Sequence, residues 1–239
     1  MWSICKKELR QFFSSLTGYI ALVIFLLLNS LFLFVFPESN LFDYGYATLD
    51  KFFEIAPWIL LLLIPAITMR SFADEFRGGT YEILQTRPLT RWQMIGGKYM
   101  ASMIIVILAI LPTLVYVYTI RELSTGGIDS GGIAGSYIGL FLLAAVFAAI
   151  GTWCSSLTAN AVVAFLLSAF SCFLVYSAFT AISNLSVFER GLGYYVELLG
   201  IDAHYKSISR GVIDSRDILY FASVVLFFLF LTARNLVKR

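Results

Sequence analysis

Residues 99–120 read YMASMIIVILAILPTLVYVYTI and contain no charged side chain. At about 1.5 Å of rise per residue, a helix of this length crosses the roughly 30 Å hydrocarbon core of a bilayer. The whole chain shares this character, because 59% of its 239 residues are hydrophobic and 13% are charged, against about 45 to 50% and about 25% in soluble domains. The sequence therefore predicts an all-α membrane protein.

Five further segments are long and apolar enough to span the bilayer. They are residues 18–36, 57–71, 134–153, 160–182 and 217–233. No stretch between the six segments is long and mixed enough in composition to build a separate core. We expect six transmembrane helices in a single domain that covers residues 1–239.

The positive charges predict the orientation of these helices. If the N-terminus lies inside, the inner segments carry most of the 17 lysines and arginines, namely Lys6, Lys7, Arg10, Arg70, Arg77, Arg87, Arg91, Lys98, Arg234, Lys238 and Arg239. The outer segments then carry Lys51, Arg121, Arg190, Lys206, Arg210 and Arg216. The positive-inside rule places both termini in the cytoplasm, and we expect a multi-pass protein of the bacterial inner membrane.

The first 17 residues precede the first span and are too charged to cross the membrane. Apolar side chains nevertheless recur near helical spacing beside Lys6, Lys7 and Arg10. This pattern is typical of an amphipathic helix that lies in the membrane interface.

Prolines and glycines mark special positions inside the spans. Pro65 and Pro112 each remove a backbone hydrogen bond, so we expect helix kinks there. Gly131, Gly135 and Gly139 fall four residues apart, which predicts a packing face where a neighbouring backbone approaches closely.

The segment between spans two and three, residues 72–98, is the most informative. Gly78 and Gly79 should interrupt the helix that leaves span two, Thr80 can cap a new helix, and Pro88 should end it. The short helix would present charged and apolar side chains together, namely Asp74, Glu75, Phe76, Arg77, Tyr81, Glu82, Ile83 and Leu84. Such a surface suits a protein partner, and the alternative is a solvated intracellular loop.

Residues 183–216, on the outer side, are long for a simple connection. They contain an apolar group between Gly193 and Gly200. A short re-entrant or interfacial helix fits this pattern better than an aqueous loop.

Patterns for catalysis are not found. Trp92 occupies the position where a P-loop ending at Gly97 and Lys98 requires glycine, and no H-E-x-x-H or G-x-S-x-G pattern occurs. We expect His204 to be an ordinary exposed or interfacial histidine and foresee no metal site. Cys5, Cys154 and Cys172 are expected to be thiols outside any disulfide. The chain is therefore not expected to be an enzyme.

Several stretches resemble the coupling region of type-two ABC exporter permeases. They are DEFRGGTYEIL (74–84), RPLT (87–90) and GK (97–98), and the six-span layout agrees. The chain is also similar to the permease subunit of gliding-motility-associated ABC exporters, in FFSSLTGY (12–19), NLFDYGYA (40–47), APW (56–58), IPAITMRSF (64–72), IDSG (128–131) and GSYIGL (135–140).

This resemblance implies an export permease with an elbow helix in residues 1–17, a coupling helix in residues 72–98 and re-entrant helices in residues 183–216. The residues implied to contact a separate ATPase subunit are Asp74, Glu75, Phe76, Arg77, Gly78, Gly79, Thr80, Tyr81, Glu82 and Leu84. The family pattern has two permease and two ATPase subunits, with ATP and Mg²⁺ bound by the ATPase and no cofactor in this chain.

Two alternatives remain at the level of sequence. A non-transporting membrane scaffold or assembly protein could use residues 72–98 as an interaction surface. An ion-coupled secondary transporter is the other alternative, but it normally needs ionisable groups inside its spans. No such group lies at the centre of a predicted span. The substrate, and the choice between homodimer and heterodimer, stay open.

Overall fold

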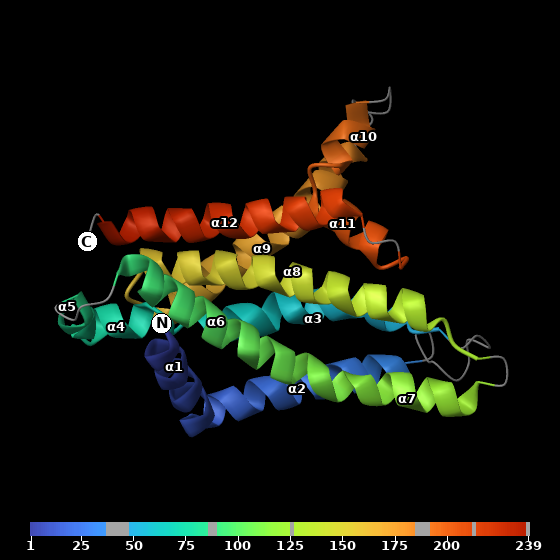
Figure 1. Ribbon diagram of the computed structural model, residues 1–239, viewed down its shortest axis with the longest axis horizontal. Coiled ribbons are helices and arrows are strands. Elements are labelled where there is room, and N and C mark those ends of the chain that lie inside the picture. The colour runs from blue at the N-terminus through green and yellow to red at the C-terminus, as the bar shows by residue number, and fades with distance from the viewer. Residues whose placement is uncertain (37–47, 86–89, 125–126, 185–191, 212–213, 238–239) are drawn as a thin grey trace.

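The computed structural model describes residues 1–36, 48–85, 90–124, 127–184, 192–211 and 214–237, which are helical over most of their length (Figure 1). The helices in order are α1 (Trp2–Ser14), α2 (Leu16–Phe34), α3 (Asp50–Thr68), α4 (Ala73–Arg77), α5 (Thr80–Gln85), α6 (Arg91–Ile110), the 3₁₀ turn η1 (Leu111–Thr113), α7 (Leu114–Leu123), α8 (Ser130–Leu157), α9 (Ala161–Ser183), α10 (Leu192–Glu197), α11 (Ile201–Ile208) and α12 (Ser215–Val237).

The prediction of six membrane-spanning segments is confirmed. Within the described residues, six helical segments are long and apolar enough to cross a membrane. They are Leu16–Phe34, Asp50–Arg77, Arg91–Leu123, Ser130–Leu157, Ala161–Ser183 and Ser215–Val237. Each one contains the core of a segment expected from the sequence.

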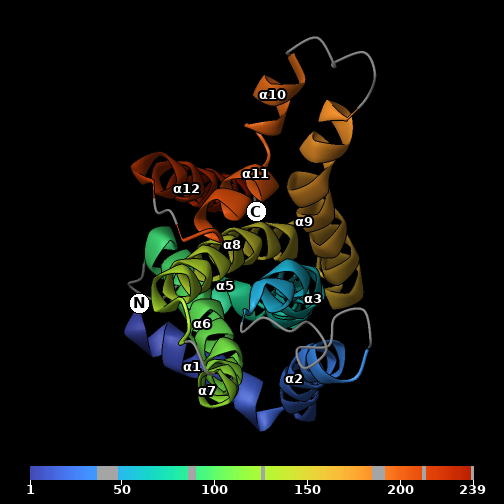
Figure 2. The ribbon, with the colours of Figure 1, turned by 90° about the vertical axis from the view of Figure 1, so that its right-hand side faces the viewer.

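Helix α8 lies at the centre of the bundle, and α3, α6, α9 and α12 pack around it (Figure 2). Its inward positions carry small side chains such as Ala144, Ala148 and Gly151, which are fully or almost fully buried. Small residues allow neighbouring helix backbones to approach closely. The other faces of α2, α9 and α12 expose large apolar side chains, as expected for helices in contact with lipid.

Helix α3 begins at Asp50, earlier than the expected start of this span at residue 57. The added turns are held by aromatic contacts, because the ring of Phe53 meets Tyr137 of α8 at 5.1 Å and Phe52 meets Tyr116 of α7 at 5.7 Å. The helix runs through both Pro57 and Pro65.

The third span changes its helical geometry at Pro112. Helix α6 ends at Ile110, and the turn η1, which contains Pro112, leads into α7. The Thr113 hydroxyl donates to the Ile110 carbonyl at 2.6 Å, and Tyr137 donates to the Thr113 carbonyl at 3.1 Å. Side chains thus provide hydrogen bonds at the point where proline interrupts the helical pattern.

The short helices gather at the two ends of the bundle. Helices α1, α4 and α5 lie at the same end as both chain termini, whereas α7, α10 and α11 lie toward the other end (Figure 1). The motif at residues 40–47 and Pro88 lie outside the described residues.

Candidate functional site

The α4–α5 segment, residues 73–85, follows span two directly and is anchored to the central helix. The Ser155 hydroxyl of α8 accepts hydrogen bonds from the Phe72 and Ala73 amides at 2.9 and 3.2 Å. The same hydroxyl donates to the Met69 carbonyl at 3.0 Å. One buried serine therefore satisfies the backbone where α3 ends and α4 begins.

The two glycines separate α4 from α5, as predicted. Helix α4 ends at Arg77, and the Gly78 amide donates to the Asp74 carbonyl at 2.9 Å. Gly79 has a φ of +64°, in the left-handed region that side chains with a Cβ rarely adopt. Glycine is needed here for the turn that starts α5 at Thr80.

A small apolar cluster supports the segment from inside. It consists of Phe72, Tyr81, Ile95 and Leu236, contributed by the α3–α4 turn, α5, α6 and α12. The Phe76 ring meets the Tyr81 ring edge to face at 5.0 Å. The segment therefore packs as a folded unit against α6 and α12.

A buried group of charges joins the segment to α1 and α6. The side chain of Lys98 on α6 is fully buried, and its ammonium lies 2.7 Å from Glu8 of α1 and 2.9 Å from Glu75 of α4. It also donates to the Ser71 carbonyl. The three donors of the ammonium thus have three acceptors, and we call Lys7, Glu8, Glu75 and Lys98 the ion cluster.

Lys7 completes the ion cluster from the solvent side. Its ammonium lies 2.7 Å from Glu75, and its side chain is 48% exposed. Partial burial lowers the pKa of Lys7, but the hydrogen bond and negative charge of Glu75, with the charge of Glu8, outweigh it, so the pKa is raised. The cluster contains two cations and two anions, which balances the charge that the fold buries.

Helix α1 approaches α6 closely because Gly97 precedes Lys98. A Cβ at Gly97 would lie 2.8 Å from the Met1 carbonyl oxygen and 2.9 Å from Cβ of Ile4. No side chain fits at that position without a shift of α1. Gly97 therefore allows α1 and α6 to approach closely, and Lys98 of α6 then joins them through its ion pair with Glu8 of α1.

The predicted contact residues divide into a buried and an exposed group. Glu75 and Tyr81 are buried within the chain, so the expectation that they belong to an exposed surface is wrong. Glu75 is withdrawn from solvent by its ion pair with Lys98 of α6. Tyr81 is withdrawn by packing against Ile95 of α6 and Leu236 of α12. The exposed members are Arg77, Gly78, Gly79, Thr80 and Glu82, with Asp74, Phe76 and Leu84 partly exposed.

The predicted glycine face packs against α11, but only in part. A Cβ at Gly135 would lie 2.9 Å from Gly211 Cα, and one at Gly139 would lie 3.0 Å from Ile208 Cγ2. A Cβ at Gly131 would meet only Asp129, at 3.5 Å, because Gly131 lies in the first turn of α8. Gly132 takes that role instead, since a Cβ on Gly211 would lie 2.8 Å from its Cα.

The segment before the last span contains α10 and α11. His204 of α11 lies 2.6 Å from Asp217 of α12 through Nδ1 and 2.9 Å from the Leu198 carbonyl oxygen through Nε2. Its ring stacks on Tyr220 at 4.0 Å. The His204 side chain is 14% exposed, so of the two expected positions, exposed or interfacial, the exposed one does not hold. The residue ties α11 to α12.

The three cysteines are free thiols, and all of them are buried. Among the described residues, no group of three or more His, Cys, Asp or Glu side chains is placed to hold a metal ion.

Sequence reasoning missed the ion cluster and Ser155. Glu8, Glu75 and Lys98 all flank apolar helices on the same predicted side of the membrane. This shared position was the one feature of the sequence that could have indicated an ion pair among them. No local pattern distinguishes Ser155 from the adjacent Ser156.

The chain matches the family described as ABC-2 family transporter protein over residues 2–232. Among curated proteins, none matches the chain significantly.

Proposed function

The chain belongs to the ABC-2 transporter family, and on that premise we propose that it is the permease subunit of an ATP-driven exporter whose ATPase is a separate protein. Membership implies an ABC ATPase partner and a bilayer setting. The exposed part of the α4–α5 segment, residues 77–80, 82 and 83, is our candidate for the surface that binds this ATPase. It combines the charges of Arg77 and Glu82 with the exposed apolar side chain of Ile83.

The observation that carries the proposal is the position of Glu75. Glu75 lies two positions before the exposed surface begins at Arg77, and its carboxylate forms an ion pair with Lys98 of α6. A displacement of α4 by the ATPase would therefore act on α6 directly and, through the ammonium of Lys98 and Glu8, on α1. Coupling between two sites is typically worth about 1 to 3 kcal/mol, which is within the range of rearranging a few such contacts.

The transport cycle that we propose has two states. ATP binding closes a pair of ATPase subunits beneath a pair of permease subunits, and the α4–α5 segments move with them. Gly79 allows a change of angle between α4 and α5, and the 3₁₀ turn at Pro112 divides the third span into two parts that can reorient. Export follows from that reorientation of spans two and three.

We place the α4–α5 end in the cytoplasm of a bacterial inner membrane, with both termini, because it carries most of the cations. From the motifs shared with such permeases, we also propose a role in a gliding-motility system. A strain that lacks this chain is then expected to lose surface gliding, and wild-type chain restores it. Normal gliding of that strain would remove this part of the proposal.

The central experiment is affinity purification of the chain from detergent, with assays for a bound ATPase polypeptide and for ATP hydrolysis. Glu82→Arg, on the exposed surface, is expected to lower ATPase recovery about tenfold, which corresponds to about 1.4 kcal/mol of binding free energy. Glu122→Arg is the matched control, because Glu122 is an exposed glutamate at the end of α7, toward the other end of the bundle.

Glu75→Gln separates binding from coupling in the same assay. The ATPase should still co-purify, because Glu75 is buried, but the permease should no longer stimulate hydrolysis. If Glu82→Arg left both recovery and stimulation intact, the proposed surface would be wrong. If no ATPase accompanied the wild type, the scaffold alternative would be favoured.

A further inference from the structure

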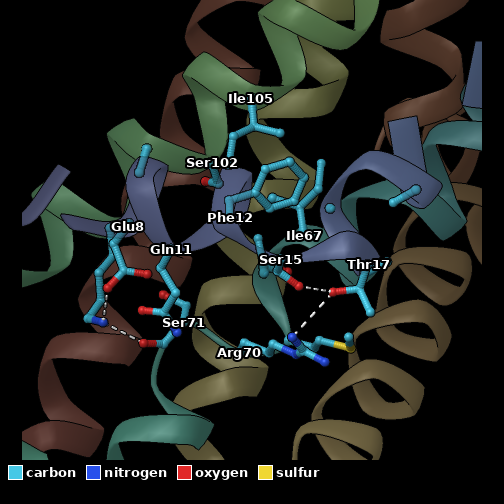
Figure 3. A pocket seen from close by; sticks show the side chains of 17 residues that line it. Glu8, Gln11, Phe12, Ser15, Thr17, Ile67, Arg70, Ser71, Ser102 and Ile105 are labelled. Atoms are coloured by element: carbon cyan, nitrogen blue, oxygen red, sulfur yellow. Dashed lines mark hydrogen bonds and ion pairs between the residues drawn. The ribbon is translucent and has the colours of Figure 1, made fainter. Parts of the chain in front are cut away.

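Beside the ion cluster, α1, α2, α3 and α6 enclose a cavity of about 120 Å³ (Figure 3). A water molecule takes up about 30 Å³ in the liquid, so the cavity holds about four waters. That space suits a phosphate-sized group with the first carbons attached to it. It is too small for a complete lipid, whose chains would have to lie outside.

The floor of the cavity is apolar and its rim is polar. Buried side chains of Ile67 on α3 and Ile105 on α6, with the partly buried ring of Phe12, form the floor. Exposed Thr17 and Arg70 form the rim, where the Arg70 guanidinium donates to the Thr17 hydroxyl at 3.3 Å (Figure 3). A ligand for this site must be apolar at one end and polar at the other.

The charge of the cavity favours an anion at the rim. Glu8, Arg70 and Lys98 are its charged lining residues, and Glu8 and Lys98 are paired at 2.7 Å. Among the described residues, Arg70 has no carboxylate within ion-pair distance. An arginine guanidinium binds phosphate through two parallel hydrogen bonds, so phosphate is the anion that this rim fits best.

Two hydroxyls stand beside Arg70 at the rim. Ser15 and Thr17 both line the cavity, and their hydroxyls share a hydrogen bond (Figure 3). Hydroxyl groups can donate to phosphate oxygens, so they suit the same anion as the guanidinium.

The ends of the candidate spans put the cavity at the depth expected for lipid headgroups. It is placed where the candidate span α2 begins at Leu16 and where α3 ends at Thr68, beside the amphipathic helix α1. Basic pockets between membrane helices at this depth bind lipid headgroups, and an interfacial helix lies next to them.

We propose that this cavity binds one phospholipid. The phosphate contacts Arg70 and the hydroxyls of Ser15 and Thr17 at the rim, and the first apolar carbons enter the floor beside Phe12 and Ile67. Because Glu8, Ser71 and Lys98 belong both to the cavity wall and to the contacts of the ion cluster, the lipid stabilises the same junction that joins α1, α4 and α6.

The test is native mass spectrometry of the purified full-length permease in detergent. Three probes are titrated separately: dioleoyl phosphatidylglycerol, dioleoylglycerol without a phosphate, and inorganic phosphate. The wild type is expected to bind one phosphatidylglycerol at least tenfold more tightly than either of the other probes. The measurement needs no ATPase, so its failure is distinct from failure of the proposed function.

Two variants locate the bound lipid. Arg70→Gln removes the rim charge from an exposed position and should weaken phosphatidylglycerol binding about tenfold, whereas Arg234→Gln, an exposed cation on α12 outside the cavity, should leave it unchanged. Ala66→Leu narrows the floor without changing charge and should weaken binding severalfold. Equal binding by wild type and Arg70→Gln would overturn the proposal, and so would free phosphate binding as tightly as the lipid.

Discussion

The ammonium of Lys98 lies 2.9 Å from the carboxylate of Glu75, inside the protein and at the base of the exposed α4–α5 surface. The same ammonium lies 2.7 Å from Glu8, so a single side chain joins three helices. Taking charges out of water is unfavourable, and it is offset only when each charge keeps a partner. The arrangement therefore favours joint movement of α1, α4 and α6.

Lys98→Met is expected to destabilise the folded protein by about 3 to 5 kcal/mol, because two largely buried carboxylates lose their common cation. The triple variant Glu8→Gln, Glu75→Gln and Lys98→Met should recover much of that loss, since it removes the unpaired charges as well. The measurement is unfolding of the purified protein in detergent.

The control is Lys51→Met, which removes a cation from an exposed ion pair with Glu54 at 3.0 Å. Exposed pairs contribute at most about 1 kcal/mol, so this variant should unfold almost as the wild type does. Equal unfolding of Lys98→Met and Lys51→Met would show that the ion cluster does not stabilise the fold.

Gly135→Ala and Gly131→Ala form a matched pair on one helix. The added methyl at Gly135 would lie 2.9 Å from the backbone of Gly211, and overpacking of this kind is unfavourable by about 1 to 3 kcal/mol. At Gly131 the methyl meets only Asp129 at 3.5 Å, and alanine favours the helix by up to about 1 kcal/mol. Relative to the wild type, Gly135→Ala should therefore unfold at a lower temperature and Gly131→Ala at the same or a higher temperature. The reverse order would contradict packing of α11 on α8.

Cys5 is expected to react slowly with maleimide in a variant that carries Cys154→Ala and Cys172→Ala. The residue is 1% exposed, and burial, together with the charge of Glu8, raises the pKa of the Cys5 thiol. The thiolate is the reactive form, so a raised pKa leaves less of it at neutral pH. The rate of reaction should therefore increase only at a pH higher than an ordinary cysteine thiol requires.

The comparison for Cys5 is Ser14→Cys in a variant that also carries Cys5→Ala, because Ser14 is exposed on the same helix. Its reaction at neutral pH should be at least tenfold faster. Similar rates for the two thiols would mean that α1 does not pack on α6 as described.

Patterns along the chain predicted much of the fold. Uncharged apolar runs such as residues 99–120 are long enough to require a membrane, since an exposed backbone group inside lipid is strongly unfavourable and a helix satisfies all of them. Gly78 and Gly79 marked the break between α4 and α5, and Gly79 adopts a positive φ that excludes most other residues. The early start of α3 was missed, because aromatic contacts of Phe52 and Phe53 with distant helices stabilise its first turns.

The sequence by itself determined the six spans, the break at Gly78 and Gly79 and the change of geometry at Pro112, because these follow from local hydrophobicity and backbone restrictions. Only the tertiary structure decided that Glu75 lies inside rather than on the predicted contact surface, since its burial depends on Lys98, a partner 23 positions along the chain. It likewise decided that Ser155 anchors α4 and that Arg70 stands beside an apolar cavity. Contacts of this kind arise where separate helices meet, and a local pattern does not show which side chains of the two helices will lie opposite one another.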